Sequence, residues 1–198
     1  MEEKIIAENI KMVYSSLGTH ESFYSAERKW IEYVQKDYTV NFLHRQICTH
    51  KIAGIYSAFS PMKTVEQNKK LVIEFLTSPN QTVNTMGSQI DKAREILNVK
   101  GYGKETIPEI KRILNGKKTV NFFLNLSGDN QAVTIDRHMI KLFPSNWSSL
   151  TDTRYDILAE EIKKFANIRG SYPSEIQERL WQKLKTVRTL SDIVLYTR

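Results

Sequence analysis

Apolar residues recur at helical spacing along most of the chain, and this pattern limits the possible folds more than any other feature of the sequence. Apolar side chains three or four positions apart line one face of an α-helix, as Ile6, Ile10 and Val13 do. The only strand-like stretch, residues 132–135, is short and has no recognisable partner strand. The 198 residues suit one domain, or two half-domains that share a core. We therefore expect an all-α fold.

Proline and glycine divide this pattern into separate segments. Ser60-Pro61 and Ser78-Pro79 end helices, because the residue before a proline disfavours the helical conformation. Asn115-Gly116 forms a tight break between two helices. The expected helices contain the segments 6–17, 24–34, 43–59, 65–76, 90–97, 107–114, 120–124, 137–142, 152–168 and 174–188, most of which are given by their first and last apolar residues.

Composition excludes several classes of protein. The single cysteine, Cys48, excludes an intramolecular disulfide framework, a cysteine zinc finger and a four-cysteine iron–sulfur cluster, and we expect it to pack in the core. No cofactor or metal is expected. No apolar run is long enough to span a membrane, and the start of the chain lacks signal-peptide features, so we expect a cytoplasmic protein without a membrane partner. The net charge of +7 favours an anionic partner such as nucleic acid.

One stretch combines features that suit chemistry on a phosphate-bearing substrate. Gly116 precedes a helix that opens with Lys117 and Lys118, and the free N–H groups of a helix N-terminus suit a phosphate. Asp136 ends the apolar run Val133-Thr134-Ile135, where a poorly solvated carboxylate can act as a base or stabilise a cation. Each residue also has a simpler interpretation: solvated first-turn lysines, and an aspartate that caps a short helix.

The combination resembles the helix-hairpin-helix DNA glycosylase superfamily, which includes endonuclease III and 8-oxoguanine glycosylase. The resemblance rests on residues 116–121, Gly-Lys-Lys-Thr-Val-Asn, followed by Ile135-Asp136-Arg137-His138. Lys118 and Asp136 are 18 residues apart, as expected in the endonuclease III branch. Weaker matches are Ser57-Ala58 with Asn68, and Asp91-Lys92-Ala93. The clear resemblance covers residues 50–142, and a looser one links both ends to small phage-encoded members.

The resemblance implies a helix-hairpin-helix glycosylase-like fold, in which two helical half-domains flank a cleft. We expect residues 42–140 to form the central domain with the hairpin and the Lys/Asp motif. Residues 1–41 and 141–198 would form the second half-domain from both ends of the chain. The implied partner is double-stranded DNA with a flipped base, bound by a monomer without an iron–sulfur cluster.

The implied activity is that of a bifunctional DNA glycosylase with AP-lyase activity, in base-excision repair or phage biology. Lys118 would be the nucleophile, with its amine made neutral by desolvation and by Lys117, and Asp136 would assist it. Expected DNA contacts come from the hairpin and its basic surroundings: Gly116, Lys117, Thr119, Lys111, Lys100 and His138. His138 would alternatively position the Asp136 loop. Six basic and two acidic residues between positions 99 and 118 give this region a local charge of +4.

The sequence also suggests candidate residues for a base pocket, a wedge and the core, and it leaves two alternative functions open. Tyr24, Tyr56 and Phe59 are candidates for a base pocket, Phe59 or Met62 for a wedge residue, and Trp30, Trp147 and Trp181 for core positions. The hairpin has one glycine where the family has Pro-Gly-Val-Gly, so its phosphate contact is expected to be weakened or rearranged. The alternative functions are a phage-type enzyme that modifies DNA bases on the same scaffold, and a non-catalytic binder of DNA or protein.

Overall fold

Helices and loops account for all the residues that the computed structural model describes, which are residues 2–18, 22–41, 47–81, 83–144 and 149–195. The all-α prediction is therefore confirmed for this part of the chain. The helices, with 3-10 helices marked η, are α1 (Glu2–Ser15), α2 (Phe23–Asn41), α3 (Thr49–Phe59), α4 (Val65–Thr77), α5 (Gly87–Leu97), η1 (Lys104–Thr106), α6 (Ile107–Leu114), α7 (Lys117–Leu126), η2 (Arg137–Leu142), α8 (Asp152–Arg169), α9 (Pro173–Thr186) and α10 (Ser191–Leu195).

Local sequence signals explain most helix ends. Thr64 caps α4 in a capping box with Gln67, in which each side chain accepts the other residue's backbone N–H. Thr151 caps α8, which ends at Gly170 in the left-handed conformation. The expected helix over residues 43–59 begins at Thr49 in the structure, with Cys48 as its N-cap, while residues 42–46 lie outside the described part. The short helix α10 was not predicted.

The chain forms two compact units, which are described separately below. Unit 1 comprises Met1–Tyr24 and Asp129–Arg198, and unit 2 comprises Ser25–Gly128. The expected domains were residues 42–140, and residues 1–41 together with 141–198. They differ from the observed units in two segments, residues 25–41 and residues 129–140. Residues 25–41 belong to unit 2, because Glu27 and Arg28 of α2 bond to Tyr56 and Asn125 there. Residues 129–140 belong to unit 1, where Val133, Ile135 and Met139 enter the core.

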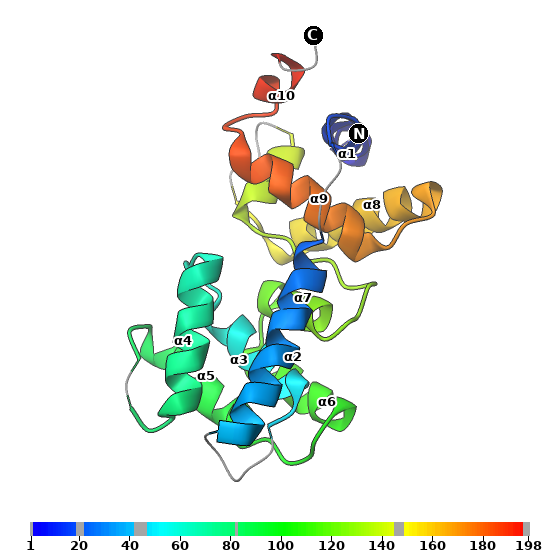
Figure 1. Cartoon of the computed structure of the whole chain (residues 1–198). Helices are drawn as coiled ribbons and strands as arrows, with labels where there is room; N and C mark the ends of the chain where they lie inside the picture. The colour runs from blue at the N-terminus through cyan, green and yellow to red at the C-terminus, as the bar shows by residue number, and fades with distance from the viewer. Residues whose placement is uncertain (1, 19–21, 42–46, 82, 145–148, 196–198) are drawn as a thin grey trace. The chain divides into compact units, whose positions relative to one another are not determined.

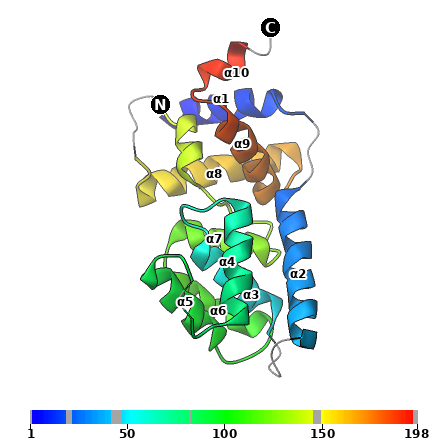
Figure 2. The same cartoon turned by 60° about the vertical axis from the view of Figure 1, so that its left-hand side comes forward.

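Unit 2 is built around α3, which packs against α4, α5, α6 and α7 (Figure 1, Figure 2). All eight residues from Ile52 to Phe59 are buried, as expected for a helix surrounded by others. Gly54 marks the closest approach: a Cβ atom there would lie 2.8 Å from Ile110 Cγ2 and 3.1 Å from Ile96 Cγ2. The absence of a side chain at Gly54 thus lets α5 and α6 close on α3.

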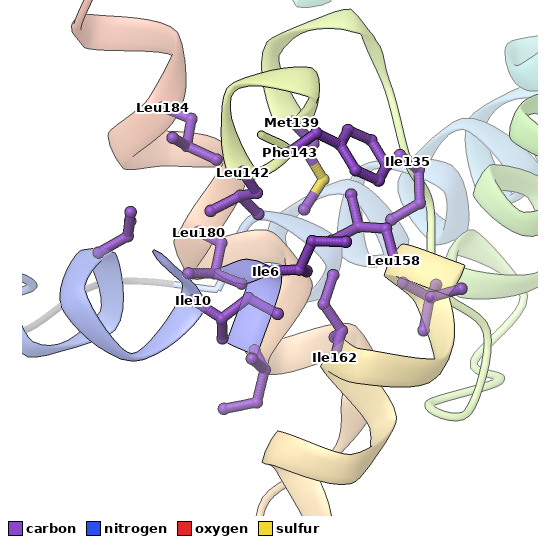
Figure 3. Packing of buried hydrophobic residues seen from close by; sticks show 14 of the residues in the cluster. Ile6, Ile10, Ile135, Met139, Leu142, Phe143, Leu158, Ile162, Leu180 and Leu184 are labelled. Carbon is purple, nitrogen blue, oxygen red and sulfur yellow. The ribbon is translucent and has the colours of Figure 1, made fainter. Parts of the chain in front are cut away.

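Unit 1 combines both ends of the chain around one apolar core. Ile6 and Ile10 of α1 meet Leu158 and Ile162 of α8, while α9 and η2 add further apolar side chains (Figure 3). Tyr155 ties the extended segment before η2 to this core, because its hydroxyl donates to Val133 O at 2.7 Å and accepts from Ile135 N at 3.2 Å. The segment that leads into Asp136 is therefore fixed to the core of unit 1.

No helix in the described ranges combines the length and the apolar character that a bilayer crossing requires.

Candidate functional site

The first part of the site is the α6–α7 hairpin in unit 2. Helix α6 ends at Asn115, whose φ of 46° and ψ of 41° reverse the chain, and Gly116 in an extended conformation precedes α7. The Gly116 carbonyl accepts from Val120 N at 2.8 Å and from Thr119 Oγ1 at 3.0 Å. A non-glycine residue in the left-handed conformation is uncommon, but asparagine tolerates it better than most. One asparagine and one glycine thus make this turn.

The hairpin presents positive charge at the start of α7. Gly116 has no side chain to cap the helix, and Lys117 and Lys118 occupy its first turn. The Lys118 side chain is exposed and that of Lys117 is half-buried. Lys117 and Asn121 are linked, because Asn121 Nδ2 donates to Lys117 O at 2.8 Å. The hairpin by itself therefore does not supply the desolvation expected around the Lys118 amine.

Two cationic side chains outside the hairpin hold its helices in place. Lys92 on α5 donates from Nζ to Leu114 O at 2.8 Å, at the C-terminus of α6. Arg28 on α2 donates from Nη1 to Asn125 O at 2.9 Å, at the C-terminus of α7. Cations at these positions also complement the negative end of each helix dipole. Lys92 is the lysine of the weak sequence match, and its observed contact supports the hairpin turn.

The second part of the site is Asp136 in unit 1. Asp136 is the N-cap of η2: its Oδ1 accepts from His138 N at 2.8 Å. Its Oδ2 accepts from the indole Nε1 of Trp181 at 2.9 Å. The contact to Oδ1 is made by the backbone N–H of His138, so the two expected roles of its side chain stay predictions. The interpretation of Asp136 as a helix cap is confirmed. Capping is compatible with a chemical role for Asp136, because it fixes the direction of the carboxylate.

Helix α9 supplies polar support that the sequence analysis did not identify. Glu178 is buried and accepts hydrogen bonds from Ser22 Oγ at 3.1 Å, from Phe23 N, and from Tyr24 N at 3.3 Å. It thereby caps the start of α2 with a carboxylate. The neighbouring Gln177 accepts from Tyr24 OH at 2.8 Å. The signal available in the sequence was the looser resemblance of the chain's ends to small phage-encoded proteins, which in this helix rests on Pro173-Ser174-Glu175-Ile176-Gln177 and Trp181.

Trp181 contacts Asp136, another aromatic ring and a lysine, and it is not fully buried in the core. Its ring centroid lies 5.6 Å from that of Phe23, and Lys185 Nζ lies 4.4 Å from the Trp181 ring. The side chain is only half-buried. Trp30 in unit 2 is also half-buried, with its ring 5.5 Å from that of Tyr56, while Trp147 lies outside the described residues.

The three base-pocket candidates are core residues in the structure. Tyr24, Tyr56 and Phe59 are 5%, 1% and 0% exposed. Burial raises the pKa of Tyr24 and that of Tyr56 above the usual range, with further contributions from Glu178 and Glu27 respectively, so both hydroxyls stay protonated. Aromatic residues at helical spacing fill cores as readily as pockets, so the expected contact of these three with a flipped base stays a prediction.

A buried polar cluster surrounds Tyr56. Its hydroxyl donates to Glu27 Oε2 at 2.8 Å, and Lys69 Nζ lies 2.8 Å from Glu27 Oε1. The Asn68 amide donates to Tyr56 O at 3.0 Å and so joins α4 to α3. Asn68, one of the weaker sequence matches, thus connects two helices, and these contacts tie α2, α3 and α4 together.

The two wedge candidates have opposite environments. Phe59 is buried against Phe75, with ring centroids 5.6 Å apart, so it does not reach the surface. Met62 lies in the turn between α3 and α4, is 81% exposed and has a φ of 64°. Of the two, Met62 is the side chain that a ligand of unit 2 could contact.

The charge around the hairpin is more balanced than the sequence predicts. Arg112 Nη2 lies 2.6 Å from Glu95 Oε1 and 2.7 Å from Glu109 Oε1. Lys100 lines an open pocket of about 570 Å³ together with Glu95, Glu105 and Glu109. Lys100 therefore lies in an acidic environment, which does not favour its expected DNA contact. Lys111 is exposed on α6.

Lys118 belongs to unit 2 and Asp136 to unit 1, so their expected encounter across a cleft stays a prediction. Among the described residues, no group of histidine, cysteine, aspartate and glutamate side chains forms a candidate metal centre.

Comparison with known proteins assigns the chain to a family but not to an activity. No curated protein and no solved structure matches it. A family model described as "Family of unknown function (DUF7178)" matches residues 2–187, which is nearly the whole chain. The match includes the hairpin, Asp136 and the supporting part of α9, so the chain belongs to the DUF7178 family.

Proposed function

We propose that the protein is a DNA glycosylase with AP-lyase activity, built on a helix-hairpin-helix glycosylase-like fold. The observation that carries the proposal is the α6–α7 hairpin, whose second helix opens with Lys117 and Lys118. An aspartate with a fixed orientation, Asp136, follows it along the chain. The order and separation of these elements are those of the resemblance described above.

The hairpin suits contact with a DNA phosphate. The first N–H groups of a helix lack partners within that helix, and the N-terminus carries about half a positive charge. At α7 no side chain of the N-cap residue competes for these groups, because that residue is Gly116. Lys117 and Lys118 add full charges in the same turn. A phosphate there would position the strand next to Lys118.

The proposed reaction begins when the neutral Lys118 amine attacks C1′ of the sugar. A bond forms between Nζ and C1′, the bond between C1′ and the base breaks, and the base leaves with that electron pair and takes up a proton. Asp136 accepts a proton from the Lys118 ammonium and stabilises the cationic sugar. Opening of the sugar ring gives a Schiff base. Loss of a proton from C2′ then expels the 3′-phosphate by β-elimination and nicks the strand.

The neutral amine requires a change in the surroundings of Lys118, because the side chain is exposed. In the proposal, bound DNA removes water from this side chain and supplies the missing desolvation. Asp136 needs less rearrangement, since both of its oxygens already accept hydrogen bonds that fix the carboxylate.

The exposure of Lys118 also favours a second candidate, a protein that binds DNA without cleaving it. An exposed ammonium group at a helix N-terminus suits a phosphate contact as it stands. The two candidates differ in one respect only: whether Lys118 forms a covalent bond with the sugar.

Borohydride trapping on duplexes that contain an abasic site or a damaged or modified base tests the proposal. A glycosylase with lyase activity gives a covalent protein–DNA complex, because borohydride reduces the Schiff base. Lys118→Gln should abolish the complex, with circular dichroism showing that the fold is retained. Trapping of Lys118→Gln at the wild-type level would refute the role of Lys118, and DNA binding without any trapping would support the non-catalytic candidate.

Two matched variants distinguish the covalent role of Lys118 from the contribution of lysine charge to DNA binding. Lys70→Gln removes an exposed lysine on α4, outside the hairpin, and should trap like wild type. Lys117→Gln removes the neighbouring charge and should weaken DNA binding, while saturating DNA restores trapping. If Lys117→Gln abolished trapping at saturating DNA and Lys118→Gln did not, the two lysines would have to exchange roles.

A further inference from the structure

A basic pocket in unit 1 is lined by residues that belong neither to the hairpin nor to the Asp136 loop. It has a volume of about 240 Å³ and lies between the end of α1 and the last turns of α9. The charged side chains that line it are Arg179 and Lys183, and Gln182 lies between them in sequence. A volume below the roughly 300–1,000 Å³ of drug-sized sites suits one small group.

Arg179 is held rigidly at the wall of this pocket. Its Nη1 donates to Tyr14 OH at 2.7 Å and its Nη2 donates to Gly18 O at 3.2 Å. The guanidinium carbon also lies 4.8 Å from the centre of the Tyr14 ring. These contacts use two of the five guanidinium N–H groups, so three remain to bind a ligand. A fixed guanidinium loses less entropy on binding than a free one.

Among the residues that the structure describes, no carboxylate pairs with the positive charge of the pocket. Within the described ranges, neither Arg179 nor Lys183 forms an ion pair, and no lining residue is acidic. Glu178 points elsewhere, because it accepts hydrogen bonds from the start of α2. The pocket beside Glu95 and Glu105 in unit 2 shows the opposite pattern, with three glutamates and one lysine.

The helix dipoles weaken this charge without reversing it. The pocket adjoins the C-termini of α1 and α9, and each contributes about half a negative charge. Lys141 offsets part of the contribution from α9, because its Nζ donates to Leu184 O at 2.6 Å and to Val187 O at 2.7 Å. The two full charges of Arg179 and Lys183 therefore leave a net positive site.

We propose that this pocket binds a phosphate group through Arg179, Gln182 and Lys183. A tetrahedral phosphate offers several oxygens, so it can accept from the guanidinium, the amide and the ammonium at once. The group can belong to a nucleic-acid backbone or to free phosphate. The proposal does not depend on the glycosylase function, since it involves neither Lys118 nor Asp136.

The test is a titration of the full chain with inorganic phosphate at constant ionic strength, followed by backbone amide shifts in NMR spectra. Saturable shifts are expected in residues 16–18 and 179–186, with millimolar affinity. Lys183→Gln should weaken binding about tenfold, which corresponds to roughly 1.4 kcal/mol, near the lower end for one charged hydrogen bond. Arg179→Gln should weaken phosphate binding further. Because Arg179→Gln also removes the contacts of Arg179 with Tyr14 and could disturb the fold, Lys183→Gln provides an independent test.

Lys185→Gln is the control, because Lys185 lies on the same helix but against Trp181. It should change the phosphate affinity by less than about twofold, because Lys185 does not line the pocket and salt screens an exposed charge. An equal loss of phosphate affinity in Lys183→Gln and Lys185→Gln, or no saturable shifts, would overturn the proposal.

A second titration, with a single-stranded oligonucleotide that lacks terminal phosphates, identifies the source of the bound phosphate group. If the oligonucleotide competes with inorganic phosphate, the pocket binds a backbone phosphate; if it does not compete, the pocket binds free phosphate. Both outcomes support the pocket as a phosphate site.

Discussion

Replacing Gly54 by alanine tests how closely α5 and α6 pack on α3. In an exposed helix the change would stabilise by about 1 kcal/mol, because alanine has the higher helix propensity. At Gly54 the new Cβ would lie 2.8 Å from Ile110 Cγ2 and 3.1 Å from Ile96 Cγ2. Carbon atoms in favourable contact are about 3.5–4.0 Å apart, so both isoleucines would have to move.

The cost of that movement outweighs the gain in helix propensity. Extra methyl groups in a packed core typically cost about 1–3 kcal/mol. We expect a value near the upper end, because Cγ2 of an isoleucine is bonded directly to Cβ and cannot swing away without a change in χ1. The net loss in the free energy of unfolding should therefore be about 1–2 kcal/mol.

Urea unfolding followed by circular dichroism measures this difference, and hydrogen exchange of the α3 amides reports on unit 2 by itself. The matched control is Gly87→Ala at the start of α5, where a new Cβ would meet no atom within 4 Å. That variant should be as stable as wild type or gain up to about 0.5 kcal/mol. A Gly54→Ala protein as stable as Gly87→Ala would refute the packing argument.

Two further predictions concern Cys48 and Trp181. Burial raises the pKa of the Cys48 thiol. Hydrogen bonds from the His50 side chain and from the backbone N–H groups of Lys51 and Gly103 outweigh burial and lower the pKa of Cys48 to about 7. A folded pKa below the usual value of about 8.5 means that the free energy of unfolding rises with pH, most steeply between pH 7 and 8.5, by roughly 2 kcal/mol over the whole transition. Denaturation of Cys48→Ser should lack this rise; an unchanged slope would contradict the assignment. Trp181→Phe removes the donor to Asp136 Oδ2 and should cost about 1.5 kcal/mol of stability. It should also slow borohydride trapping; wild-type values in both assays would show that the indole hydrogen bond is dispensable.

The hairpin was the part of the site that sequence could predict best. Asn115-Gly116 forms the expected break, and Lys117 and Lys118 open the next helix. Both features depend on residues close in sequence, because a turn and a helix start are set by local conformational preference and hydrogen bonding. The N-cap role of Asp136 was predictable for the same reason.

The surroundings of these residues were not predictable. Trp181 reaches Asp136 across 45 residues of sequence, and Glu178 caps the start of α2 from the other end of the chain. Tyr56 and Phe59 share the aromatic character of pocket residues, yet packing places them in the core. Arg112 is one of the six basic residues near the hairpin, but Glu95 on α5 offsets part of its charge.

The all-α class, most helix ends and the composition of the hairpin follow from local sequence, because helical periodicity, proline, glycine and capping residues act over a few positions. Packing between distant segments sets the rest: α5 and α6 close on α3 at Gly54, Lys92 and Arg28 hold the hairpin, and Trp181 orients Asp136. These contacts join residues far apart in the chain, and their partners are selected by shape and burial once the helices pack.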